Sequence, residues 1–225
     1  MSLLRELQEI TERTYQKASG INLENFIIGK QRFFDLSSLC APAAAELSEI
    51  ARVFYRKAGE GLYLAVYFSE QLISLLETHD PRKGLHEKNI YPFLVFIEEI
   101  NHCVHAALKF VSGDRAVNTE EFIRDLELLA KIDSYQMLKF FLAYFNPSNK
   151  LENFDRLWIK HHLFERPNFE YDNRTLRVRY EETNRLGEKY TRFLDGMEAE
   201  SRLEEMRRFR AMRYGVKARY IAMLP

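Results

Sequence analysis

The chain has little of what shapes loop-rich or disulfide-bonded proteins. Its 225 residues include 9 glycines, 6 prolines and 2 cysteines. So few glycines and prolines argue against an all-β fold with many tight turns and favour a helical one. Cys40 and Cys103 show no regular spacing, so we expect two small buried thiols in a reducing compartment, and neither a disulfide framework nor a zinc site.

Net charge and long apolar runs are also missing. Basic residues (Lys and Arg) and acidic residues (Asp and Glu) both number 33, so the charge balance gives no reason to expect nucleic acid or an acidic membrane surface as the main partner. The opening segment MSLLRELQEI mixes charges with Leu and Ile and lacks the apolar core of a signal peptide. No run approaches the roughly 20 apolar residues of a membrane span. We therefore expect a cytoplasmic protein.

Helical periodicity dominates what is present, and turn residues such as Gly113 and Pro147 separate the periodic segments. Helices are expected at about 2–18, 43–58, 62–77, 91–111, 118–145, 151–165 and 181–214. Residues 19–42 are expected to form a loop with a short helix, and Asp172-Asn173 the turn of a small hairpin within 168–180. The predicted fold is a single all-α domain over residues 1–225, a helical bundle at about 62–165 with extra N- and C-terminal helices.

The helix expected at 91–111 carries charge where burial is expected. Over residues 90–108 the only formally charged side chains are Glu98 and Glu99, close to His102 and His105. Glu70 is likewise the only charged residue between positions 62 and 76. Short turns make long helices antiparallel neighbours, so residues equally far from a turn at residue 84 lie at one height, and Glu70 should face Glu98.

The same geometry brings the next helix to this level. Around a turn at residue 115, Glu99 and His102 face positions 131 and 128, and the nearest carboxylates are Glu127 and Asp133. Glu127 stands four residues before Lys131 and fits a surface ion pair. Asp133 continues an apolar stripe of its helix, so it is the preferred candidate.

The last helix of the bundle completes the set. Around a turn at residues 147–148, Asp133 faces His162, which lies beside His161 and Glu165. Acids and imidazoles from four helices would then meet within one helical turn, roughly 5 Å. Buried carboxylates need a counter-charge, and mixed carboxylate and imidazole ligands suit iron or manganese. The predicted metal ligands are Glu70, Glu98, Glu99, His102, Asp133, His161, His162 and Glu165.

Glu70 followed by Glu99-Ile100-Asn101-His102 resembles the ferritin-like di-iron carboxylate bundles, whose pattern is one Glu and then Glu-x-x-His on each helix pair. The second half departs from that pattern, because Asp133 would replace a Glu and His162-Leu163-Phe164-Glu165 reverses the order. The resemblance covers about 62–165. The pattern is also similar to the heme-oxygenase-like helical folds, some of which hold paired iron less regularly. Either resemblance implies a di-iron cofactor and oxygen-activating oxidoreductase chemistry on a small-molecule substrate.

A metal-free interpretation stays open. Glu98 and Glu99 could pair with basic residues of a neighbouring helix, and the protein would then be a helical scaffold or interaction protein. Residues 201–225 hold seven Lys or Arg and two acids, so a basic C-terminal helix could bind a partner. It shows no recognised RNA-binding motif, so we expect no nucleic acid, but a solvated helix that could pack on a second subunit in a homodimer.

Overall fold

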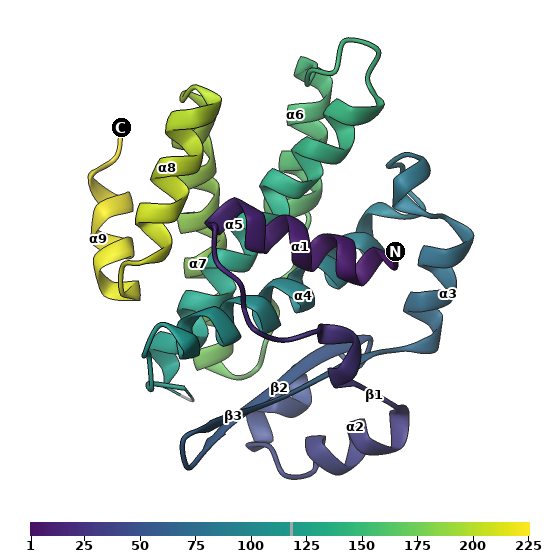
Figure 1. Ribbon diagram of the computed structural model, residues 1–225, viewed down its shortest axis with the longest axis vertical. Helices are drawn as coiled ribbons and strands as arrows, with labels where there is room; N and C mark the ends of the chain where they lie inside the picture. The colour runs from purple at the N-terminus through teal and green to yellow at the C-terminus, as the bar shows by residue number, and fades with distance from the viewer. Residues whose placement is uncertain (118) are drawn as a thin grey trace.

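The computed structural model describes residues 1–117 and 119–225, and over that part of the chain the protein is mostly helical, with a small sheet (Figure 1). The helices are α1 (Leu3–Tyr15), α2 (Lys30–Ser37), α3 (Glu70–Thr78), α4 (Ile90–Val111), α5 (Glu120–Phe145), α6 (Asn153–Lys160), α7 (Arg174–Asp195), α8 (Ala199–Arg210) and α9 (Tyr214–Met223). The strands are β1 (Ile27–Ile28), β2 (Ala51–Ala58) and β3 (Gly61–Phe68). The helical class is confirmed, whereas the sheet was not predicted. Within the described ranges, no helix is both long and apolar enough to cross a membrane.

The sheet replaces two of the predicted helices. β2 and β3 form an antiparallel hairpin with Val53 opposite Val66, and β1 adds to β3 in parallel. Gly59 turns the chain with a φ of 56°, a conformation that glycine adopts without strain. The helix predicted at 43–58 is wrong, because Pro42 opens only a short 3₁₀ turn (Pro42–Glu46), and the helix predicted at 62–77 begins only at Glu70.

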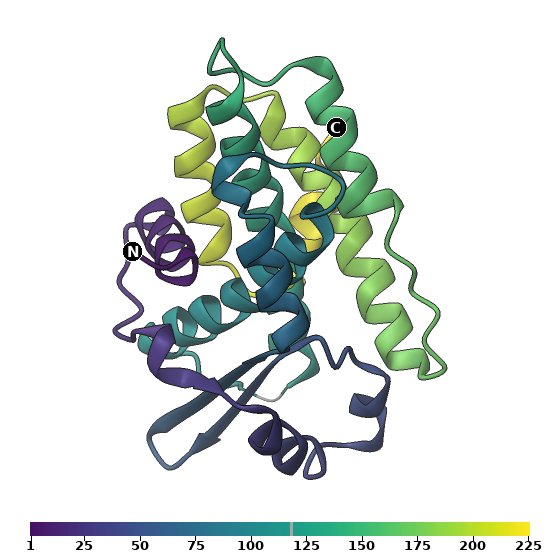
Figure 2. The same cartoon turned by 90° about the vertical axis from the view of Figure 1, so that its right-hand side faces the viewer.

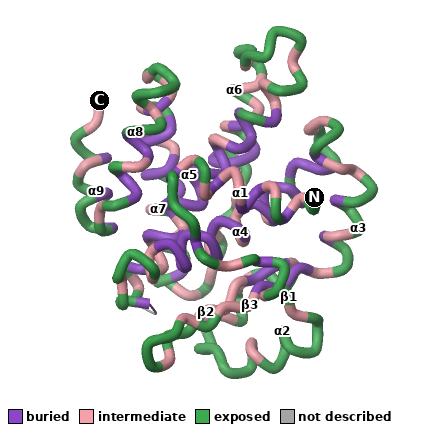
Figure 3. The backbone as a smooth tube through the Cα atoms, viewed as in Figure 1, coloured by how far each residue is buried: buried purple, intermediate pink, exposed green. Residues whose placement is uncertain are grey.

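The sheet lies at one end of the molecule with α2 beside it, and the helices rise from its other side (Figures 1 and 2). α4 packs against β2, β3, α1 and α5 and is the central helix of the core. Figure 3 shows the buried backbone concentrated in α1, α4, α5 and α7, while α2 and the hairpin tip are exposed. Cys103 of α4 is buried as predicted, but Cys40 is exposed, so that expectation was wrong for Cys40.

Helices α4 and α5 confirm the predictions for 91–111 and 118–145. The hydroxyl of Thr119 caps α5 by accepting a hydrogen bond from the backbone N–H of Phe122, while Asn118 of the expected capping sequence lies outside the described residues. The helix predicted at 151–165 is also present, because α6 continues into one turn of π-helix over His161–Glu165.

The C-terminal part differs from the prediction. Asn173 does not turn a hairpin but caps α7, since its side chain accepts hydrogen bonds from the backbone of Thr175 and Leu176. The single helix predicted at 181–214 is present as two helices, because α7 begins earlier, at Arg174, and a turn at Gly196 separates it from α8; α9 follows at the end of the predicted range. α7 and α9 pack on α5, and α8 packs on α1 (Figure 1).

Several basic residues of this part point inward, while Arg208, Arg213 and Arg219 are exposed. Arg207 Nε donates to the carbonyl oxygen of Thr14 at 2.8 Å, and the Arg210 guanidinium lies 5.6 Å from the centre of the Tyr15 ring. The side chain of Lys217 is fully buried. The sequence predicts a solvated basic helix. In the structure, some of these basic residues instead hold α8 and α9 against the rest of the protein.

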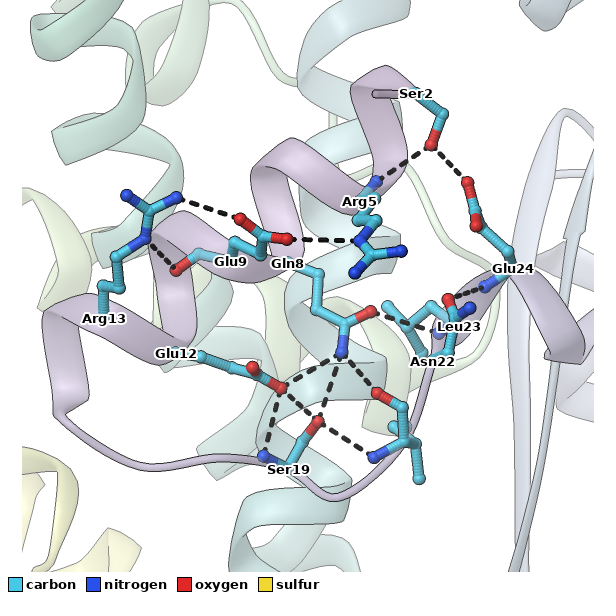
Figure 4. A network of polar contacts seen from close by, with 11 residues as sticks. Ser2, Arg5, Gln8, Glu9, Glu12, Arg13, Ser19, Asn22, Leu23 and Glu24 are labelled. Atoms are coloured by element: carbon cyan, nitrogen blue, oxygen red, sulfur yellow. Dashed lines mark hydrogen bonds and ion pairs between the residues drawn. The ribbon is translucent and has the colours of Figure 1, made fainter.

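A polar network fastens the segment after α1 to that helix (Figure 4). Gln8 Nε2 donates to the Ile21 carbonyl oxygen at 2.6 Å, and Gln8 Oε1 accepts from the Leu23 backbone N–H at 3.1 Å. Ser19 donates to Glu12, again on α1. These bonds hold the chain against α1 as it descends to the sheet.

Candidate functional site

The eight predicted ligands do not meet at one point. Glu70 is exposed in the first turn of α3, where Ser69 caps the helix. It was expected to face Glu98 because residues 62–77 were expected to be one helix. Since residues 61–68 form a strand, that register does not exist.

Asp133 is buried, but in another environment. Its Oδ1 accepts a hydrogen bond from the Tyr15 hydroxyl at 2.6 Å, and its Oδ2 lies 2.6 Å from His105 Nε2. Tyr15 comes from α1 and His105 from α4, so Asp133 joins three helices. Its two oxygens are thus occupied by protein donors.

His161, His162 and Glu165 form a third environment near the surface. His162 Nε2 lies 3.0 Å from Glu87 Oε1, in the loop before α4, and Trp158 donates to the same oxygen at 2.8 Å. His161 is exposed and lies 3.5 Å from Glu165, whose carboxylate also pairs with a lysine. Trp158 and His162 thus hold this helix against the loop at Glu87, whereas His161 and Glu165 do not contact that loop's carboxylate.

Two polar contacts join α4 to α5 one helical turn apart. Glu98 Oε1 lies 2.6 Å from Lys131 Nζ, and His102 Nε2 lies 3.3 Å from Glu127 Oε2. Position 102 was expected opposite 128, so the predicted register of this helix pair is right to within one residue. Glu127 was not among the predicted ligands, because its spacing from Lys131 indicated an ion pair on the surface. In the structure, Glu127 faces His102 of α4 and Lys131 faces Glu98.

His102 is the centre of this group. Its Nδ1 lies 3.6 Å from Glu99 Oε2, and its Nε2 is buried without a hydrogen-bond partner. The side chains of His102 and Glu127 are each 12% exposed, and that of Glu99 is 19% exposed. Burial opposes protonation of the imidazole, but the carboxylates of Glu127 and Glu99 outweigh it and raise the pKa of His102 well above its ordinary value. The group therefore attracts positive charge. We refer to Glu99, His102 and Glu127 as the His102 group.

Three tyrosines surround the His102 group. Burial, and then the charge of Glu127, raise the pKa of Tyr55 on β2, of Tyr180 on α7 and of Tyr171 just before α7. The rings of Tyr171 and Tyr180 stack with their centres 5.1 Å apart. The phenols remain neutral at physiological pH and give the group an aromatic border.

The metal-binding capacity of these residues is limited as the side chains stand. Within residues 1–117 and 119–225, no three His, Cys, Asp or Glu side chains form a group that could hold a metal ion. Glu99 and Glu127 address opposite nitrogens of the His102 ring. His102 Nε2 and Glu127 Oε2, 3.3 Å apart, are the pair of possible ligand atoms considered below.

A second polar cluster is buried at the contact of α4, α5 and α9. Asp125 accepts from Lys217 Nζ at 2.5 Å and from Lys109 Nζ at 2.6 Å. Burial lowers the pKa of Lys217 to about 8, although Asp125 opposes that change. No sequence pattern indicated this cluster, because a lysine in a basic run is normally solvated.

No family model matches the chain, and neither a curated protein nor a solved structure is significantly similar to it. Its chemistry therefore has to follow from the geometry of its own residues.

Proposed function

We propose that the protein binds a single divalent transition-metal ion at the His102 group. His102 Nε2 and Glu127 Oε2 would be the protein ligands, and Glu99 would orient the imidazole through Nδ1. Because the pKa of His102 is raised, the ion would displace a proton from the imidazole, which is released to water. The observation that carries the proposal is the buried Nε2 atom, which has no hydrogen-bond partner although a carboxylate oxygen lies 3.3 Å away.

That distance fits two ligands of one ion. Nitrogen and oxygen ligands bind zinc at roughly 2.0–2.2 Å, so two of them at a tetrahedral angle lie about 3.3 Å apart. A metal-ligating histidine usually directs its other nitrogen to a carboxylate, and Glu99 stands 3.6 Å from Nδ1. His102 Nε2 and Glu127 Oε2 thus make a poor hydrogen bond, but their separation suits two ligands of one metal ion.

The donor set indicates the chemistry. One imidazole with carboxylates suits manganese, iron or zinc, and two protein ligands leave coordination positions for water and substrate. An iron ion there would support the oxygen-activating chemistry implied by the resemblance to di-iron bundles, but with one ion. The tyrosine border would give a small organic substrate an apolar contact surface.

Metal titration tests the proposal. Tag-free protein is titrated calorimetrically with Mn²⁺, with Zn²⁺ and, under anaerobic conditions, with Fe²⁺. We expect one ion per chain, with binding weakened at least tenfold in His102→Gln and in Glu127→Gln. His161→Gln and Glu165→Gln are matched controls, because they remove exposed predicted ligands outside the His102 group, and they should bind as the unaltered protein does.

Circular dichroism confirms that each variant is folded. The proposal fails if the folded, unaltered protein binds none of the three ions, or if His102→Gln binds them unchanged.

The second candidate, a metal-free helical scaffold, is favoured by the 2.6 Å pair of Glu98 with Lys131, which already neutralises one predicted ligand. Failure to bind any ion would leave that candidate.

A further inference from the structure

Glu98 lies next to the His102 group but takes no part in it. It precedes His102 by one turn of α4, so both side chains lie on the same face of the helix. Its carboxylate is held by Lys131 at 2.6 Å, and its side chain remains 26% exposed. A carboxylate so placed would be a third metal ligand if Lys131 did not hold it.

Lys131 is positioned by its own surroundings. It follows Glu127 by one turn of α5 and is 8% exposed. Behind it, α7 approaches so closely that a Cβ atom at Gly187 would lie 3.2 Å from the Lys131 Cβ atom. The stem is thus packed between helices, and the ammonium group is directed toward α4.

We propose that Lys131 is a built-in competitor for the metal, and that Glu98 exchanges its contact with Lys131 for coordination of the ion when the metal binds. This inference rests on the proposed function. The exchange breaks one ion pair and forms one metal–carboxylate bond, while Lys131 keeps its proton and its ammonium group turns to water.

The exchange is favourable in electrostatic terms once a divalent ion arrives. An ammonium group supplies one positive charge, and the ion supplies two within one coordination sphere. Lys131 therefore has two opposite effects. It neutralises Glu98 in the metal-free protein, and it lowers the affinity for the metal by occupying the third ligand.

Affinity measurements on four proteins test this inference. The unaltered protein, Lys131→Met, Glu98→Gln and the double variant are titrated with Mn²⁺ and Zn²⁺. Lys131→Met keeps the length of the buried stem, and we expect it to bind at least tenfold more tightly. Glu98→Gln should bind more weakly than the unaltered protein, and the double variant should show no gain over Glu98→Gln.

Lys139→Met is the matched control, because Lys139 is another buried lysine of α5 but pairs with Asp195 on α7. It should leave the metal affinity unchanged. If Lys131→Met does not fold, Lys131→Gln replaces it.

The outcomes separate the two proposals. If the unaltered protein binds metal through His102 and Glu127 but Lys131→Met binds no more tightly, the inference is wrong and the proposed function stands. The same holds if the gain persists in the double variant. If the folded, unaltered protein binds no metal, both are wrong.

Discussion

Replacing Lys217 by methionine should stabilise the protein. Lys217 is fully buried, and its amine lies 2.5 Å from Asp125. Asp125 would not be left unpaired in the variant, because Lys109 Nζ holds its other oxygen at 2.6 Å. Methionine has a stem of similar length and no charge, so Lys217→Met removes the buried ammonium group without opening a large cavity.

The magnitude follows from the pKa of Lys217. Folding lowers it from 10.5 to about 8, chiefly by burial, with the charges of Lys109 and Arg210 adding to the effect. Such a change corresponds to roughly 3 kcal/mol of destabilisation when the amine is protonated in both states. Loss of the hydrogen bond to Asp125 offsets about 1 kcal/mol. We expect Lys217→Met to raise the free energy of unfolding by about 2 kcal/mol near neutral pH.

The pH dependence gives the sharper test. Below a pH of about 8 both states carry the proton, and the full cost is present. Between about 8 and 10.5 the folded protein has released the proton and the unfolded chain has not, so stability rises with pH. The advantage of Lys217→Met should therefore shrink by about 1 kcal/mol between roughly pH 7 and pH 9.

Urea unfolding followed by circular dichroism measures both quantities. The variant is compared with the unaltered protein at each pH, so that titration of tyrosines in the unfolded chain cancels. Lys88→Met, at an exposed lysine, is the control and should change stability little at any pH. The reasoning is refuted if Lys217→Met is destabilised near neutral pH, or if its difference from the unaltered protein does not vary with pH.

Two further substitutions test the packing around the candidate site. Gly187→Ala should destabilise the protein by about 1 kcal/mol in urea unfolding, because the new methyl group meets the Lys131 Cβ atom at 3.2 Å at a cost of about 1–3 kcal/mol, while the better helix propensity of alanine returns about 1 kcal/mol. Gly215→Ala, whose nearest contact is an ordinary 3.8 Å, should cost nothing, and an equal loss in both variants would contradict this account. Tyr15→Phe removes the 2.6 Å hydrogen bond to the buried Asp133 and should cost about 1–3 kcal/mol. Tyr63→Phe, at an exposed ring, is its control, and equal thermal melting of both variants would count against a structural role for the Tyr15 hydroxyl.

The sequence predicted the long helices well and the sheet not at all. α4 and α5 are long, strongly periodic and bounded by clear turn residues, so their apolar pattern predicts a helix and does not fit a strand. Ala51–Ala58 and Gly61–Phe68 are short apolar runs, which periodicity alone cannot separate from helix. The neglected sign was Gly59-Glu60-Gly61 between two runs rich in aromatic and β-branched residues.

The candidate site was predictable only where the helices were. The register of α4 against α5 could be calculated, and it placed His102 within one residue of its actual neighbour Glu127. The position of Glu70 was predicted wrongly, because its pairing with Glu98 assumed a helix where the chain forms strand β3. His162 was misplaced because the loop at Glu87 folds over α6, and no local pattern shows which loop will do so.

The interior ties together segments that are made at very different times. Tyr15 and Asp133 are 118 positions apart, and Lys217 follows Asp125 by another 92. At a synthesis rate of roughly 5–20 residues per second, α1 leaves the ribosome about 6–24 s before its carboxylate partner exists. α1 also packs against α4, which ends at Val111, so Leu4 and Leu7 can be covered before Asp133 is made. The hydrogen bond from Tyr15 to Asp133 can form only later, and the one from Lys217 to Asp125 later still.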